Sequence, residues 1–65
     1  MSRTIELDAD RGQLVLRFDY DKFLVEEVKT LPERRWDKGG RCWRIPAKHA
    51  EAVVEQMMKH GFIVD

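Results

Sequence analysis

Hydrophobic and polar residues alternate along two short runs near the start of the chain, residues 4–8 and 13–18. Side chains two residues apart lie on the same face of a strand, so each run has one hydrophobic face. The alternating hydrophobic positions are Ile5, Leu7, Leu14, Leu16 and Phe18. Between the runs lies the segment ADRG, residues 9–12, whose final Gly12 suits a positive φ. This pattern predicts a β-hairpin.

The hydrophobic spacing becomes helical over residues 20–30. Hydrophobic positions recur every three or four residues at Tyr20, Leu24, Val28 and Leu31, and Phe23 broadens this stripe. Asp19 is a candidate N-cap, because a short carboxylate accepts hydrogen bonds from the first free amides of a helix. Pro32 lacks a backbone N–H and ends the pattern. We therefore expect a helix over about residues 20–30.

A second hairpin is predicted over residues 34–45, where the turn segment DKGG at 37–40 separates two runs that contain tryptophan. With a loop of two or four residues, position 36 would lie opposite 41 and position 34 opposite 43. Trp36, Trp43 and Ile45 would then share one face, and Arg35, Cys42 and Arg44 the other. A three-residue loop would break this arrangement, so the assignment of faces depends on the loop length.

The clearest helical period lies near the end of the chain, after Pro46, which suits the first turn of a helix. Its hydrophobic positions are Ala50, Val53, Val54, Met57 and Met58. Gly61 suits the end of this helix, and residues 62–64 suit a short final strand. The element order is therefore ββαββα(β). This order predicts an α+β fold in which a small antiparallel sheet carries two helices on one face.

Length and composition limit the range of functions. A chain of 65 residues has room for a single domain, residues 1–65. It contains no run of about 18 apolar residues that would span a membrane, and we expect no secretory signal near Met1. Cys42 is the only cysteine, which excludes an internal disulfide. We therefore expect a cytoplasmic protein with no membrane association.

The charged residues are distributed unevenly along a chain whose formal net charge is zero. Residues 34–48 hold six Lys or Arg residues against Asp37 alone, a net charge of +5. Residues 1–33 have a net charge of −3 and residues 49–65 of −2. A strongly basic segment inside a neutral protein creates a local field that attracts anionic ligands.

Catalytic and metal-binding patterns are lacking in the sequence. Gly39 and Gly40 belong to a turn, and no phosphate-binding GxxxxGK[ST] motif is present. His49 and His60 lie eleven positions apart without carboxylates at metal-ligand spacing. We therefore expect a chain that is not an enzyme and that uses no metal or cofactor.

The basic second hairpin carries the candidate chemistry. Arginine donates two parallel hydrogen bonds to a phosphate, so a hairpin rich in arginine suits a nucleic-acid backbone. The candidate DNA-binding residues are Arg17, Lys29, Arg34, Arg35, Lys38, Arg41, Arg44 and Lys48. Arg17, Arg35 and Arg44 are expected on one open face without carboxylates nearby, and Lys48 at a helix N-terminus that favours anions.

Each of these residues also has a purely structural interpretation. Trp36 and Trp43 can stack on unpaired bases, but a domain of this size also needs large hydrophobic side chains in its core. The arginines can equally form a solvated sheet face, since surface charge is common.

Four segments resemble the HARP (HepA-related protein) domain and its bacterial and phage relatives. They are LRFDYD at 16–21, VKTLP at 28–32, RRWD at 34–37 and RCWRIP at 41–46, and a weaker similarity extends through Gly61 and Phe62. In that family the domain accompanies a Snf2-type ATPase motor in annealing helicases, and similar modules accompany other helicases and phage-type integrases. The resemblance implies DNA binding directed by structure, such as a fork, junction or single strand. It assigns the contact to Lys29 and the basic hairpin.

We therefore expect a monomeric DNA-binding accessory module of a helicase or recombinase involved in DNA repair or recombination, of bacterial, archaeal or phage-type origin. Its partners would be DNA and an ATPase motor or integrase domain. Two alternatives remain open. The hairpin can instead bind an acidic protein surface, with dimerisation through sheet edges as a variant, or the domain can be purely structural within a larger DNA-processing protein.

Overall fold

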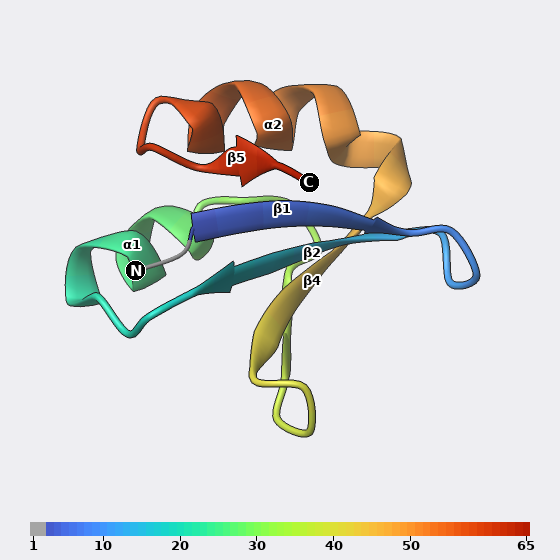
Figure 1. Ribbon diagram of the computed structural model, residues 1–65, viewed down its shortest axis with the longest axis horizontal. Helices are drawn as coiled ribbons and strands as arrows, with labels where there is room; N and C mark the ends of the chain where they lie inside the picture. Colours follow the sequence, from blue (N-terminus) through green and yellow to red (C-terminus); the bar gives the residue numbers. More distant parts are fainter. Residues whose placement is uncertain (1–2) are drawn as a thin grey trace.

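The computed structural model describes residues 3–65 and shows an α+β fold with a five-stranded sheet and two helices (Figure 1). The elements are β1 (Arg3–Asp8), β2 (Gln13–Phe18), α1 (Lys22–Val28), β3 (Arg35–Asp37), β4 (Cys42–Pro46), the 3-10 turn η1 (Ala47–His49), α2 (Ala50–Met58) and β5 (Ile63–Val64). The strands lie in the order β3-β4-β2-β1-β5. The predicted fold class and element order are confirmed.

The first hairpin forms as its alternating pattern predicts. β1 and β2 pair antiparallel along their whole lengths, from Arg3 opposite Phe18 to Asp8 opposite Gln13. Gly12 closes the turn with a φ of 63°, a left-handed conformation that glycine adopts without strain.

The second hairpin has a four-residue loop, residues 38–41, and its register differs from the prediction. Trp36 lies opposite Trp43 rather than opposite position 41, and Asp37 lies opposite Cys42. The two tryptophans still share a face, because shifting the partner by two positions leaves the alternation unchanged. Trp43 is half-buried and packs against the core, whereas Trp36 remains 52% exposed.

Helix α1 begins later than predicted because Asp21, not Asp19, is its N-cap. One carboxylate oxygen of Asp21 accepts hydrogen bonds from the backbone N–H groups of Phe23 and Leu24. Tyr20 therefore precedes the helix and is 82% exposed, and Phe23 is also exposed. Both were predicted to belong to the hydrophobic stripe of this helix, and neither is buried.

Helix α2 follows β4 through η1, and its C-terminus has the two hydrogen bonds of a Schellman motif. The N–H of Phe62 donates to the carbonyl of Met57, and the N–H of Gly61 donates to the carbonyl of Met58. The chain then turns back at Gly61 (φ 82°) into β5, which pairs parallel to β1. The sheet is therefore mixed, not wholly antiparallel as predicted.

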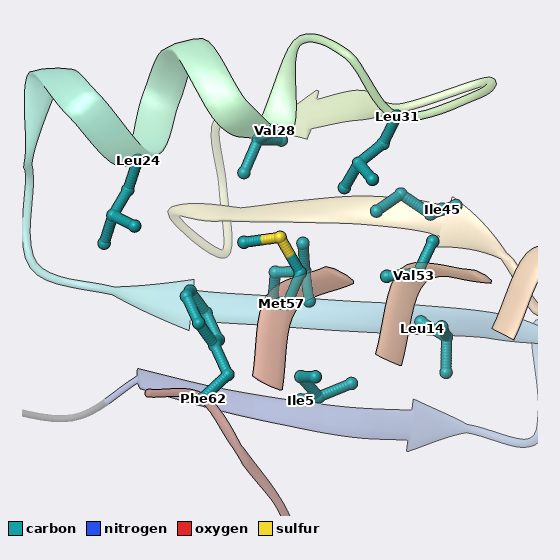
Figure 2. Close-up of a cluster of buried hydrophobic side chains, with 10 residues drawn as sticks. Ile5, Leu14, Leu24, Val28, Leu31, Ile45, Val53, Met57 and Phe62 are labelled. Carbon is teal, nitrogen blue, oxygen red and sulfur yellow. The ribbon is translucent and has the colours of Figure 1, made fainter. Parts of the chain in front are cut away.

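Both helices cover the same face of the sheet, and the core lies between them and the strands (Figure 2). Each helix connects two strands that run in the same direction, β2 to β3 and β4 to β5, so it must cross a face of the sheet. The buried cluster comprises Ile5, Leu14, Leu16, Leu24, Val28, Leu31, Ile45, Val53, Met57 and Phe62. Met58 points away from it and is exposed.

Candidate nucleic-acid interface

Arg44 lies at the centre of the open sheet face and is held by two carboxylates. Its Nε donates to Oδ2 of Asp37 at 2.7 Å, and its Nη1 donates to Oδ2 of Asp8 at 3.0 Å. Only 17% of the arginine side chain is exposed. The guanidinium therefore joins β4 to the ends of β1 and β3.

These contacts change the pKa values of all three groups in the direction that favours the charged form of each. The hydrogen bond from Arg44 lowers the pKa of Asp37, with help from the Gly40 amide. At Asp8 partial burial opposes ionisation, but bonds from Arg44 and the Arg11 amide outweigh it and lower the pKa. The two carboxylates in turn raise the pKa of Arg44. The network is therefore ionised and paired at neutral pH.

Arg17 is also engaged within the protein. Its Nε lies 3.5 Å from Oε1 of Glu6, and its Nη1 donates to the carbonyl of Gly40 at 3.1 Å. Val15 and Cys42 lie on this same face yet are buried, as expected where long side chains cover small hydrophobic ones. The prediction that Arg17 and Arg44 have no carboxylates nearby is wrong, because the strand register brings acidic residues to both.

Two further candidate cations have acidic partners. Lys29 lies 3.7 Å from Glu26 on the same helix. The Nζ of Lys48 lies 3.1 Å from Oε2 of Glu33, and the Nε2 of His49 lies 2.7 Å from the same oxygen. The hydrogen bonds from His49 and then Lys48 lower the pKa of Glu33. Lys48 therefore helps tie the segment before β3 to η1.

The remaining four candidates make no ion pair with any carboxylate of residues 3–65. They are Arg34, Arg35, Lys38 and Arg41, and all four are exposed. They belong to the β3–β4 hairpin and the residue before it, and the tip of this hairpin stands clear of the rest of the fold in Figure 1. We call these four residues the free cations.

The two sides of the hairpin differ in character. Toward the open face, a hollow of about 360 Å³ is lined by Gln13, Glu33, Arg34, Arg35, Arg44 and Pro46. Toward α1, a cleft of about 430 Å³ is lined mainly by rings; its residues are Leu16, Phe18, Asp19, Tyr20, Val25, Trp36, Arg41 and Trp43. We call these the arginine hollow and the aromatic cleft.

Within the aromatic cleft, the ring centroids of Trp36 and Trp43 are 5.3 Å apart with planes tilted by 59°. Phe18 and Tyr20 were not predicted to line a cleft, because the hydrophobic periods place Phe18 on the hydrophobic face of a strand and Tyr20 on that of a helix. Asp21 is a second candidate N-cap in the sequence, two residues after Asp19. A helix that begins at Asp21 leaves Tyr20 outside it, free to line the cleft.

Within residues 3–65, no cluster of three potential metal ligands occurs, and no helix is long and apolar enough to cross a membrane. No protein-family model, curated protein or solved structure matches the chain.

Proposed function

We propose that this domain is a non-catalytic DNA-binding accessory module that contacts phosphates through the β3–β4 hairpin. The observation that carries this proposal is the group of free cations, Arg34, Arg35, Lys38 and Arg41. They are exposed on one projecting hairpin, while five of the other eight Lys and Arg side chains of residues 3–65 pair with acidic residues. Unpaired cations keep their donors available for an external anion.

The proposed contact is made chiefly with the backbone of the nucleic acid. Arg34 and Arg35 line a hollow in which a phosphate would meet two guanidinium groups. Lys38 at the tip would add a contact with an adjacent phosphate. Arg17, Lys29, Arg44 and Lys48 would then support the site through their internal pairs rather than contact DNA. Recognition of this kind depends on the shape of the nucleic acid rather than on its base sequence.

The motif resemblance to HARP domains supports placing the module in a helicase or recombinase that repairs or recombines DNA. The domain would then act in the cytoplasm as a monomer, beside an ATPase motor or an integrase domain. Its own small fold would supply only the binding surface.

The test is a fluorescence-anisotropy titration of the protein against a labelled single strand, a duplex and a fork, each at two salt concentrations. We expect salt-sensitive binding that the double variant Arg34→Ala, Arg35→Ala weakens about tenfold or more. The matched control is Arg11→Ala, Lys59→Ala, which removes two exposed charges elsewhere and should leave affinity nearly unchanged. Equal loss in both variants, or no binding of any of the three ligands at low salt, would contradict the proposal in favour of a protein-binding or structural domain.

A further inference from the structure

We propose that the aromatic cleft binds an unpaired nucleobase, which would give the module a preference for single-stranded DNA and for the unpaired arms of a fork. This inference rests on the proposed function, because the hairpin that holds the phosphates also forms one wall of the cleft. It adds a second contact, to bases, on the side of the hairpin opposite the arginine hollow.

The composition of the cleft suits a flat aromatic ligand. Two of its rings, Tyr20 and Trp36, are exposed by 82% and 52%, although large aromatic side chains usually bury most of their surface. Trp43 and Phe18 are half-buried behind them and pack against the core. The volume of about 430 Å³ lies within the range of small-molecule sites, about 300–1,000 Å³. Every base has a face that can stack on such rings.

Asp19 also lines this cleft, and Arg41 supplies the cation that distinguishes it from a general hydrophobic groove. It is a free cation that lines the cleft together with both tryptophans. A base that enters the cleft carries its own phosphate, and Arg41 would meet that phosphate or stack on the base. A hydrophobic peptide would leave this cation without a partner.

The backbone at Arg41 adds an independent observation. Arg41 has a φ of 51°, in the left-handed region where a side chain is strained, although Gly39 and Gly40 precede it in the same loop. A Cβ at Gly40 would lie 3.1 Å from Asp37 Oδ2 and 3.2 Å from Cys42 Sγ, so a side chain there would require these atoms to shift by a few tenths of an ångström. Position 41 adopts the left-handed conformation, and an arginine there rather than a glycine is consistent with a role for its side chain.

Such a site would bind single-stranded DNA in preference to duplex DNA for a geometric reason. In a duplex each base is paired and stacked on its neighbours, so its faces are occupied and cannot reach a cleft in a protein. In a single strand the bases turn outward freely, and their phosphates remain available to the arginine hollow. One nucleotide chain can then engage both sides of the hairpin.

Both tryptophans of the protein line the cleft, so its intrinsic fluorescence reports on the site directly. We would titrate the protein with oligothymidine, with a blunt duplex and with inorganic polyphosphate, which offers phosphates without bases. Oligothymidine should quench tryptophan emission, whereas polyphosphate should bind in competition with it and leave the emission nearly unchanged. Tyr20→Ala should weaken oligothymidine binding about 5- to 100-fold, and Tyr20→Phe should retain it, since either ring stacks.

The matched control is Phe23→Ala, which removes an exposed ring of α1 that does not line the cleft. Arg41→Gly serves as a second variant, since glycine fits the left-handed φ; it should weaken oligothymidine binding without loss of folding. Equal affinities for oligothymidine and duplex, with unchanged emission and no effect of Tyr20→Ala, would overturn the base-binding cleft while leaving the phosphate contact intact. Failure of every nucleic acid to bind would overturn both proposals.

Discussion

Asp21 determines where α1 begins and therefore which aromatic residue reaches the candidate site. Its carboxylate satisfies the backbone N–H groups of Phe23 and Leu24, and the backbone of Asp21 itself is extended. Tyr20 consequently lies in the segment between β2 and α1, where it lines the aromatic cleft. A start at Asp19 would have carried Tyr20 into the first turn of the helix. A single capping residue thus links the fold to the candidate base-binding surface.

Replacing this cap should destabilise the domain measurably. Asp21→Ala removes the acceptor for two N–H groups, and loss of an N-cap costs about 1 kcal/mol of unfolding free energy. The ion pair with Arg3 at 3.6 Å is exposed to solvent and should add little. Urea denaturation followed by circular dichroism measures the difference. Asp19→Ala is the control and should leave the midpoint nearly unchanged; equal effects of the two variants would disprove the assignment of the cap.

At the scale of secondary structure, the hydrophobic periods and turn residues predict all five strands and both helices, but not the 3-10 turn η1 or the start of α1. The alternation around Leu14 and Leu16 and the helical stripe around Val53 and Met57 both correspond to buried faces. Local patterns do not specify which strands pair at long range, so β5 beside β1 and the register of the second hairpin could not be predicted. The position of the four-residue loop decides the register: a loop at 37–40 puts Trp36 opposite position 41, and the observed loop at 38–41 puts it opposite Trp43.

The same limit explains the errors at the candidate site. The positive charge of residues 34–48 can be read from the sequence, but the ion pairs of Arg44 depend on the pairing of β4 with β2 and β3. Asp8 is 36 positions away from Arg44 and meets it only through the sheet. Charge composition therefore identified the basic hairpin, and only tertiary structure separated its free cations from its paired ones.

The Asp8–Arg44–Asp37 link should make the sheet sensitive to acid. The pKa values of both carboxyl groups are lower in the folded protein than the usual value of about 3.9 in an unfolded chain. The folded state therefore holds these protons less tightly than the unfolded state does. The resulting stabilisation is fully present above about pH 5 and is lost as pH falls through the lowered folded values.

Substitution of Asp37 tests this link. Asp37→Asn should lower stability at neutral pH, and its unfolding free energy should decline less steeply between about pH 5 and pH 2, since the amide does not titrate. Urea denaturation at a series of pH values measures both effects. Asp10→Asn, in the exposed β1–β2 turn and without an ion pair within residues 3–65, should retain the steep decline. Parallel curves for wild type and Asp37→Asn would exclude the proposed contribution.

Across the whole molecule, neither face of the sheet is free to carry unpaired positive charge, so this charge lies at the β3 edge of the sheet. Both helices cover one face, and the other carries internally paired acidic and basic residues, so neither offers an open basic surface. β3 lies at the end of the sheet, and the free cations gather around it. Charge along an edge strand also discourages pairing with the edge of another sheet. An anionic ligand would thus meet a narrow hairpin rather than a broad basic surface.

A narrow contact by four free cations has a quantitative consequence for the salt dependence of binding. Because the net charge of the whole chain is zero, affinity should come from local phosphate contacts and the counterions they release. In the proposed contact, Arg34 and Arg35 share one phosphate, and Lys38 and Arg41 take one each. Three phosphate contacts with a single strand predict that log K falls with log salt concentration with a slope of about −2. Arg34→Ala, Arg35→Ala should reduce the slope to about −1.5, whereas Arg11→Ala, Lys59→Ala should leave it unchanged. Anisotropy titrations at a series of sodium chloride concentrations measure these slopes. A wild-type slope near zero, or the same slope in all three proteins, would exclude the hairpin as the phosphate-binding element.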